Sequence, residues 1–519
     1  MHIDVLTGEA THFRGKNYIN GKFVKHKGEF FQNINPATGE SLGDFPYTEP
    51  ADIDKAVSAA RKTFRDWRHI SRIQRGDCFY RLSRIIEKHR EKLAMVISLE
   101  TGKTYNESIA EVNEALHMAM YAFGSGRQPH GEAVASELSE KDSYMIRKPK
   151  GVIAIISPFN FPAAIGAFWC AAPAIVEGNT VVIKPSEDAP MTSQICVEMY
   201  HEAGFPKGVI NLVHGEGGAG SYLVKSDIDH VCFTGSAAVG KAIRRECSRS
   251  WHKTTSCEMG SKSACIIFDD ANLDLALEAA VPSAYKLSGQ RCVSSSRMIV
   301  QRGVFDKFVS DFVVASAKQK TGNPLRMNIG TCGTPAGMVW SSYVPDESIT
   351  YGPLINEDAM NKVEAYNRMV FDDDRAELLL KGERQGSEGY FITPTVYRTE
   401  WSDALYLREE VFGPHVAIIP FDEIDDAIRI YNDTEFGLAV GVLTEDFHKA
   451  RYCRDRCDYG MCYWNGGSIA AESHLAFGGV KKSGNGYPSA ARTYRAVTHE
   501  VSWTVNHAST LSFPQGMTK

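Results

Sequence analysis

Three polar residues in the middle of the chain have side chains that nucleophilic catalysis uses. Cys292 lies in a polar loop, Ser288–Val293 (SGQRCV), where a thiolate would be a nucleophile. Glu258 follows a short strand-like run, and a carboxyl group in an apolar setting has a raised pKa and can act as a general base. Asn160 lies between a predicted strand and a predicted helix, where its amide could donate to an oxyanion or, equally, cap the helix.

Two glycine-rich turns could hold the pyrophosphate of a dinucleotide. Gly215–Gly220 is a literal GxGxxG that follows an apolar run, and spacing alone favours it slightly. The second turn, Thr234–Gly240, contains Gly235, Ser236 and Gly240, and it opens a predicted helix whose N-terminal N–H groups could hold a phosphate. A tight turn that needs glycine for its backbone shape is an equally good interpretation of either segment.

An acidic residue follows a third apolar run. Lys184 ends the run Thr180–Lys184, and Glu187 comes three residues later. A carboxylate at the end of a strand can accept hydrogen bonds from both ribose hydroxyls of an NAD adenosine, and it would repel a 2′-phosphate. A solvated loop charge is the alternative interpretation of Glu187.

Short apolar, β-branched runs alternate with helix-like segments in the middle third of the chain, and they would position these residues. The runs are Gly151–Ser157, Thr180–Lys184, Val209–Val213, His230–Thr234 and Ala264–Phe268. This alternation predicts a parallel, doubly wound sheet with ligands at the carboxyl ends of its strands. A second alternation of strands and helices begins near Ala271, and the stretch Pro324–Pro353 is predicted to be an ordered surface excursion.

The two ends of the chain carry simpler patterns. Apolar residues recur at helical spacing over Ile53–Trp67 and again over Leu82–Ile97, which predicts two helices, the second stopped at Gly102. The tail Arg495–Val505 alternates partly and is predicted to be a strand, which could pair with another subunit.

Composition excludes several classes of protein. The 519 residues carry a formal net charge of −6, so there is no overall electrostatic attraction to nucleic acid or to an anionic membrane. The apolar stretch Phe161–Val176 contains two prolines and is too short for a membrane span, so it is predicted to be a buried helix. Twelve cysteines without a secretory signal indicate a reducing, cytoplasmic location rather than a disulfide framework. The histidines show no HxH, HExxH or zinc-type spacing, so we expect no metal site.

Eight segments match motifs of the aldehyde dehydrogenase superfamily, and they occur in the family's order. The segments are SPFNFP, GNTVVIKPSE, FTGSAAVGK, EMGSKSA, GQRC, EEVFGP, FGLAVGV and FGGVKKSGNG. The chain thus resembles this superfamily from about Asn17 to the C-terminal strand. The resemblance implies an α/β fold, the aldehyde dehydrogenase fold, with a Rossmann-like coenzyme domain, an αβ catalytic domain and a small β oligomerisation arm.

The resemblance also implies that these three domains interleave along the chain. In chain order the segments are 1–128 (coenzyme-binding, first part), 129–150 (oligomerisation hairpin), 151–258 (coenzyme-binding, second part), 259–466 (catalytic), 467–484 (return segment at the active-site mouth) and 485–519 (C-terminal oligomerisation arm). A hairpin near His130–Lys150 and the C-terminal strand would build a homodimer or a homotetramer.

Family positions imply a role for each site residue. Cys292 matches the nucleophile, Glu258 matches the general base, and Asn160 matches the oxyanion donor. For the coenzyme, Lys184 and Glu187 match the contacts to the adenosine ribose, and Gly235, Ser236 and Gly240 match the turn at the pyrophosphate. Glu410 matches the contact to the nicotinamide ribose, and Phe412 matches the contact to the nicotinamide ring. The implied reaction oxidises an aldehyde to the acid through a thiohemiacetal and a thioester, with hydride transfer to NAD or, alternatively, NADP. Because the family does not bind its coenzyme through GxGxxG in the usual way, the preference for Gly215–Gly220 is reversed.

The substrate is less constrained than the chemistry. The resemblance places Lys286, Phe161 and Phe477 at the substrate, and Trp169 stands where many members carry a lysine, which puts any proton relay through that lysine in doubt. Similarity of the run Gly484–Ala490 to succinylglutamate semialdehyde dehydrogenases suggests an acidic semialdehyde, paired with Lys286 unless that side chain points to solvent.

Two other functions are weaker alternatives. A CoA-acylating semialdehyde dehydrogenase would generally lack the glutamate that Glu258 matches. A binding protein on a retired enzyme scaffold would have lost Cys292, Glu258 or Asn160, and all three are present.

Overall fold

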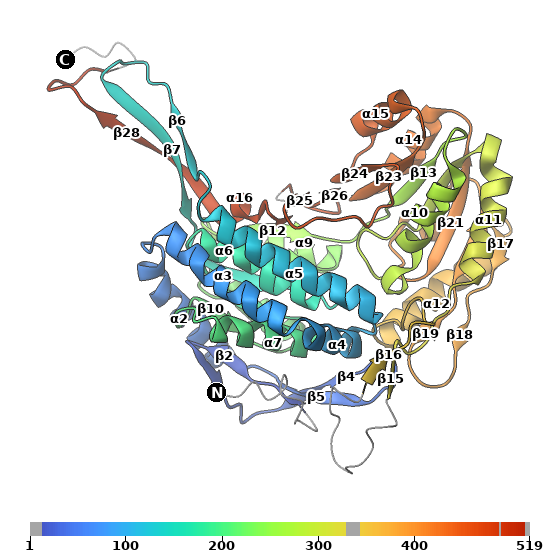
Figure 1. The fold of residues 1–519 in the computed structure, drawn as a ribbon, viewed down its shortest axis with the longest axis horizontal. Coiled ribbons are helices and arrows are strands. Elements are labelled where there is room, and N and C mark those ends of the chain that lie inside the picture. The colour runs from blue at the N-terminus through green and yellow to red at the C-terminus, as the bar shows by residue number, and fades with distance from the viewer. Residues whose placement is uncertain (1–12, 328–342, 487–488, 514–519) are drawn as a thin grey trace.

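Two seven-stranded sheets form the two halves of the molecule (Figure 1). The computed structural model describes residues 13–327, 343–486 and 489–513. The first sheet has the order β12-β11-β8-β9-β10-β2-β3, with β2 (Asn17–Ile19), β3 (Lys22–Val24), β8 (Val152–Ile156), β9 (Thr180–Lys184), β10 (Ile210–Leu212), β11 (His230–Thr234) and β12 (Thr254–Glu258). Strands β8 to β12 are parallel, as predicted, whereas β2 and β3 extend the sheet in antiparallel pairing. The strand order reverses between β8 and β11, and ligands bind beside such a switch point.

Helices cover both faces of the first sheet. They are α2 (Pro50–Trp67), α3 (Arg72–Lys88), α4 (Arg90–Thr101), α5 (Tyr105–Ser125), α6 (Ala171–Val176), α7 (Pro190–Glu202), α8 (Gly217–Lys225) and α9 (Ala237–Cys247). Helices α3 to α7 share one apolar core with one face of the sheet, and α2, α8 and α9 share another with the opposite face. The stripe over Ile53–Trp67 is buried as predicted. The single helix predicted over Leu82–Ile97 is wrong: His89 leaves the helical conformation and separates α3 from α4, which ends at Gly102 with φ 73°.

The apolar stretch Phe161–Val176 forms the buried helix that the sequence predicts. Its first part, Pro162–Cys170, is wound as a π-helix and continues into α6, and every residue of both is buried. None of the helices among the described residues is long and apolar enough to cross a membrane.

The second sheet supports the other half of the molecule. Its order is β17-β20-β21-β14-β13-β23-β24, with β13 (Ala264–Ile267), β14 (Arg297–Gln301), β17 (Glu377–Leu380), β20 (Thr395–Arg398), β21 (His415–Phe421), β23 (Ala439–Leu443) and β24 (Met461–Trp464). Only the edge strand β17 is antiparallel to its neighbour. The helices are α10 (Leu273–Tyr285), α11 (Phe305–Ala317), α12 (Glu357–Phe371), α13 (Leu405–Arg408), α14 (Ile424–Asn432) and α15 (Phe447–Arg456). The apolar run at Ala264 therefore belongs to this second sheet, not to the first as predicted, because β13 pairs with β14 and β23.

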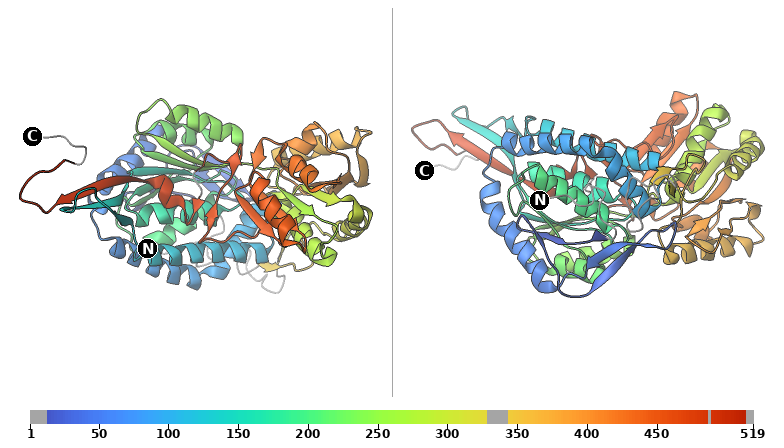
Figure 2. Two further views of the ribbon diagram at one scale, coloured as in Figure 1. Left: turned by 90° about the horizontal axis from the view of Figure 1, so that it is seen from above. Right: turned by 60° about the horizontal axis from the view of Figure 1, so that its bottom comes forward.

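A three-stranded antiparallel arm projects from the first half (Figures 1 and 2). It consists of β6 (Gly131–Val134), β7 (Lys141–Pro149) and β28 (Thr498–Asn506), with β7 in the middle. The predicted hairpin is present, and the C-terminal strand pairs with β7 of its own chain. The strand predicted over Arg495–Val505 begins only at Thr498, because the short helix α16 (Thr493–Val497) precedes it.

Short strand pairs complete the described fold. They are β1 (Phe13–Arg14) and β4 (Phe30–Ile34), both paired with β5 (Ser41–Pro46); β15 (Leu325–Met327) with β16 (Tyr343–Pro345); β18 (Arg384–Gln385) with β19 (Phe391–Ile392); β22 (Phe436–Gly437) with β26 (Val480–Lys481); and β25 (Ala476–Phe477) with β27 (Ser489–Ala490). The 3-10 turns are η2 (Lys286–Gly289) and η3 (Arg302–Val304). Part of the predicted surface excursion Pro324–Pro353 lies outside the described residues.

Candidate active site

The structure brings the three candidate catalytic residues together where loops from the two sheets meet. Asn160 follows β8, Glu258 ends β12, and Cys292 lies in the loop between η2 and β14. The Asn160 amide donates to the Gln290 carbonyl at 2.8 Å, two residues before the cysteine. The Ser261 hydroxyl, three residues after Glu258, donates to the carbonyl of Cys292.

The Cys292 loop is held in an unusual conformation. Leu287 and Ser288 both adopt left-handed backbone angles, with φ 53° and 56°, which residues other than glycine rarely adopt. The Ser288 hydroxyl donates to the carbonyl of Gly352 at 2.7 Å, and the Gln290 side chain accepts the N–H of Ile355 at 3.0 Å. These contacts fix the loop against the second half of the molecule.

The surroundings of Cys292 favour the protonated form of its thiol. Burial raises its pKa to about 12, and the charges of Glu410 and Glu258 act in the same direction. Hydrogen bonds from the backbone N–H groups of Cys292 and Val293 act in the opposite direction, because they lower the pKa and favour the thiolate. All cysteines among the described residues are unpaired, and of these only Cys292 and Cys462 are partly exposed. A nearby base is therefore needed for attack by this thiol.

Glu258 has the environment of such a base. Its side chain is buried, and burial raises the pKa of its carboxyl group well above the ordinary value. The Gly479 N–H donates to it at 3.2 Å and partly offsets that shift. A carboxylate with a raised pKa holds an abstracted proton more strongly than a solvated one, as general base catalysis requires.

Asn160 is buried and has donor capacity to spare. An amide carries two N–H donors, and the Gln290 carbonyl uses one. Its carbonyl oxygen has no hydrogen-bond partner within the described part of the chain. One N–H of Asn160 therefore holds the Cys292 loop through the Gln290 carbonyl, and the other N–H can donate to an oxyanion.

The coenzyme candidates lie at the carboxyl ends of the first sheet. Lys184 is buried, and its ammonium lies 3.1 Å from the partly exposed carboxylate of Glu187. Ser236 caps α9 by accepting the N–H of Val239 at 3.4 Å. This turn follows β11, at the switch point, whereas Gly215–Gly220 follows β10, two strands from β8.

Close packing requires glycine beside two of the candidates. A Cβ atom at Gly240 would lie 2.5 Å from the sulfur of Met259, and one at Gly235 would lie 2.6 Å from the Phe233 ring. A side chain at either position would therefore displace the Met259 or the Phe233 side chain.

Glu410 and Phe412 connect the two halves at the same place. Glu410 accepts the N–H of Ser261 at 2.7 Å, and burial raises the pKa of its carboxyl group. A Cβ at Gly260 would come within 2.3 Å of this carboxylate. Phe412 has a left-handed backbone, φ 62°, and its ring packs edge-on against Phe159, which precedes Asn160.

A buried ionic cluster adjoins Phe161, and no motif in the sequence singled it out. Lys103 forms an ion pair with Glu111, and the ammonium lies 3.8 Å from the centre of the Phe161 ring. Arg291 lies over the same ring at 5.3 Å and pairs with Glu107 at 3.2 Å. Glu111 also accepts the N–H groups of Ala163 and Ala164, at 2.8 and 3.1 Å, so it caps the π-helix. The only sequence signal was the i, i+4 spacing of the two glutamates on α5.

The remaining substrate candidates lie apart from one another. Lys286 lines a surface cavity of about 530 Å³ with Tyr105 and Asp346, and none of the three catalytic candidates lines it. Phe477 is buried and packs on Trp169 with ring centres 5.2 Å apart. The described residues contain no cluster of histidine, cysteine or carboxylate side chains suited to a metal ion.

Comparisons with known proteins identify the class. The family model "Aldehyde dehydrogenase family" matches residues 23–502. Succinate-semialdehyde dehydrogenase, mitochondrial, of Oryza sativa subsp. japonica is 34% identical over 91% of this chain and 86% of its own. Aldehyde dehydrogenase 1A1 of Mesocricetus auratus is 35% identical over 91% of both chains. The crystal structure of betaine aldehyde dehydrogenase from Staphylococcus aureus in complex with NAD+ superposes with TM-score 0.88 and 29% identity, covering 99% of each chain.

The chain therefore belongs to the aldehyde dehydrogenase family. It is an NAD(P)-dependent aldehyde dehydrogenase with the fold that its motifs predicted. Its relatives include both a semialdehyde dehydrogenase and a general aldehyde dehydrogenase at similar identity, so the likeness alone does not select the substrate.

Proposed function

We propose that Cys292, Glu258 and Asn160 oxidise an aldehyde to the carboxylic acid by a hydrolytic thioester route. The observation that carries this proposal is the meeting of a partly exposed thiol of raised pKa with a buried carboxyl group whose charge acts on it. The Cys292 thiol would pass its proton to the Glu258 carboxylate as its sulfur attacks the aldehyde carbon, and the free N–H of Asn160 would donate to the resulting oxyanion. Once the hydride has passed to the coenzyme and Glu258 has released its proton to solvent, Glu258 accepts a proton from the water that attacks the thioester, and the Cys292 sulfur leaves as the acid forms.

The residues at the first sheet fit a dinucleotide coenzyme, which would supply the hydride acceptor. Lys184 and Glu187 would hold the adenosine ribose, and the capped start of α9 offers N–H groups to a pyrophosphate. Glu410 and Phe412, beside the Cys292 loop, would hold the nicotinamide ribose and ring. We propose NAD as the coenzyme, because the Glu187 carboxylate would repel the 2′-phosphate of NADP.

Coenzyme choice can be changed at one position. With Glu187→Ser, the ratio of kcat/KM for NADP to that for NAD should rise by about tenfold or more, since a repulsive charge and two ribose hydrogen bonds are removed. The matched control is Glu216→Ser in the GxGxxG turn, where the carboxylate instead accepts the Tyr47 hydroxyl at 2.8 Å. Initial rates with both coenzymes measure the ratio, and an equal shift in the two variants contradicts the assignment.

Hydrolysis rather than CoA acylation follows from the presence of Glu258. A buried base next to the thioester carbon favours water as the acceptor. NADH formation should therefore be the same with and without CoA, and the acid should be the product. A rate that depends on CoA, or an acyl-CoA product, would overturn the hydrolytic assignment.

We propose an acidic semialdehyde as the substrate, with Arg291 as the cation that receives its carboxylate. Arg291 precedes Cys292, its side chain is 13% exposed, and its Nε is buried without a hydrogen-bond partner among the described residues. Lys286, the cation favoured by the sequence, instead lines the separate cavity beside Asp346. The name of the rice relative also supports a semialdehyde.

Two charge-removing variants test this assignment. Arg291→Gln should raise KM for succinate semialdehyde by about tenfold or more, the effect of losing one charge-assisted contact. Its KM for an uncharged alkyl aldehyde of similar length should change little, which separates recognition from general damage to the loop. Lys286→Ala is the control and should alter neither KM. A rise in KM for succinate semialdehyde in Lys286→Ala alone would contradict the role of Arg291. It would support the prediction from the sequence that Lys286 pairs with the substrate carboxylate.

We further propose that the arm mediates a homodimer or homotetramer, and that the chain divides at the interleaved boundaries predicted above. The arm's outer strands, β6 and β28, have one edge each that no described strand covers. Trp503 on β28 is 56% exposed and packs against Tyr144 of β7 with the two rings tilted by 30°. An uncovered edge with an exposed aromatic residue favours pairing with a second copy.

We also propose a cytoplasmic location, which suits the unpaired cysteines among the described residues.

A further inference from the structure

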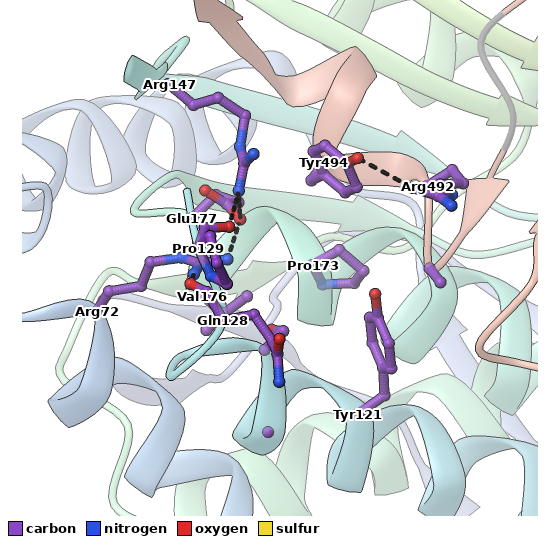
Figure 3. A pocket seen from close by; sticks show the side chains of 13 residues that line it. Arg72, Tyr121, Gln128, Pro129, Arg147, Pro173, Val176, Glu177, Arg492 and Tyr494 are labelled. Carbon is purple, nitrogen blue, oxygen red and sulfur yellow. Dashed lines mark hydrogen bonds and ion pairs between the residues drawn. The ribbon is translucent and has the colours of Figure 1, made fainter. Parts of the chain in front are cut away.

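A cationic cavity lies at the base of the arm, away from the candidate active site (Figure 3). Its volume is about 460 Å³, within the range of small-molecule sites. Its walls come from the start of α3, the C-terminal ends of α5 and α6, strand β7 and the start of α16. No candidate catalytic or coenzyme residue lines it. It therefore carries an inference independent of the proposed catalytic roles.

Positive charge dominates this cavity. Arg72, Arg147 and Arg492 line it, with Glu177 as the one carboxylate among its lining residues. Figure 3 shows Arg72 and Arg147 converging on Glu177, and their guanidinium groups lie 2.5 and 3.6 Å from the same carboxylate oxygen. Two positive charges are left unbalanced. Burial, and then the charge of Arg72, lower the pKa of the adjacent His130, which is consistent with a local excess of cations.

The guanidinium groups keep donors that the described protein does not use. The Nε atoms of Arg72 and Arg147 are buried without a hydrogen-bond partner in the described part of the chain. Arg492 is exposed and donates to the Tyr494 hydroxyl at 3.1 Å. Buried N–H groups without a partner are costly, and anionic oxygens satisfy guanidinium groups best.

The cavity also has aromatic walls. Tyr121 and Tyr494 line it, with Pro173 between them in the view of Figure 3. Arg147 also lies over the Tyr494 ring at 4.6 Å. The cavity thus combines guanidinium groups with flat aromatic walls, an arrangement that suits an anion carried on an apolar or aromatic body.

We propose that this cavity binds a small organic dianion, either a phosphomonoester or a dicarboxylate. Its charged groups would contact Arg492 and Arg147, because the contact of Arg147 with Glu177, at 3.6 Å, is longer than that of Arg72, at 2.5 Å. Its body would lie along Tyr121 and Tyr494. Such a ligand would touch α6, which continues directly from the π-helix, together with β7 of the arm and α16, which leads into β28. It would therefore tie the arm to the body of the protein.

A pair of arginines three residues apart provides the test. Arg492 and Arg495 are both exposed and both donate to the Tyr494 hydroxyl, at 3.1 and 3.4 Å, but only Arg492 lines the cavity. Binding of phenyl phosphate and of phthalate to the full-length protein would be measured by calorimetry, with NAD saturating the coenzyme site. We expect saturable binding of at least one probe with a millimolar or lower Kd, and the probe that binds identifies the source of the charge.

The variants decide between a built site and general attraction. Arg492→Gln should weaken binding about tenfold, whereas Arg495→Gln should leave it unchanged. Both variants should retain aldehyde oxidation, which shows that they fold. Absence of saturable binding for both probes overturns the proposal, as does equal weakening by the two variants. A structure of the assembled protein with an acidic side chain of a second copy in the cavity would also overturn it.

Discussion

Replacement of Cys292 by serine should reduce aldehyde oxidation by at least about 10³-fold while the protein still binds coenzyme. The reason is chemical, since a serine hydroxyl is a weaker acid and a poorer nucleophile than a thiol, and this site already disfavours ionisation through burial and two neighbouring carboxyl groups. The loss would be measured as the rate of NADH formation, and coenzyme binding as quenching of protein fluorescence.

Cys462→Ser is the matched control for this experiment. Cys462 is the other partly exposed cysteine of the described residues, and it lies on β24 rather than in the catalytic loop. Its replacement should leave kcat/KM unchanged, and alkylation of the Cys462→Ser protein should still abolish activity. Activity that survives Cys292→Ser would remove the nucleophile assignment.

Glu258→Gln should lower steady-state turnover by about 10² to 10⁴-fold, the range for loss of a general base. A burst of NADH, up to one equivalent per active site, should precede the stall, and it should be slower than in the unchanged protein because Glu258 also takes the thiol proton. Hydrolysis requires activation of water, whose pKa is about 15.7, whereas the thiol has a pKa of about 12 and loses its proton more readily. Thioester cleavage should therefore depend on Glu258 more strongly than thiol attack does.

Rapid mixing distinguishes the two half-reactions. A burst in Glu258→Gln followed by slow release of acid supports the water-activating role, and the trapped thioester should be visible as a mass increase on Cys292. Glu100→Gln offers a comparison, because this buried carboxyl group also has a raised pKa, about 7, but caps α7 through Met191 and Thr192. Unchanged turnover in Glu258→Gln would contradict the assignment.

Local sequence patterns predicted the parts of the fold that depend on neighbours in the chain. The stripe over Ile53–Trp67, the buried Phe161–Val176 segment and the parallel strands are present because apolar periodicity directly reports burial. The break at His89 and the antiparallel addition of β2 to β10 were not predicted, since both depend on packing against distant elements.

The candidate site shows the same division. Asn160 follows β8 and Glu258 ends β12, so the topology rule for parallel sheets places these two at one edge of the first sheet. Cys292 instead precedes β14, and only the resemblance to family motifs grouped it with them. The Arg291–Glu107 ion pair joins residues 184 positions apart, and no spacing rule reaches that far. The same limit applies to Lys286. It lines one cavity with Asp346, a residue 60 positions away in the chain, and the residues around Lys286 do not specify that contact.

The pairing of β28 with β7 has a consequence for synthesis of the chain. Ser143 and Thr504 face each other across these strands but are 361 residues apart. While the ribosome synthesises the intervening residues, the edge of β7 that pairs with β28 has no partner strand. An unpaired strand edge promotes aggregation. Nascent chains that stop before Thr498 should consequently depend on chaperones, even though both large sheets are complete by then.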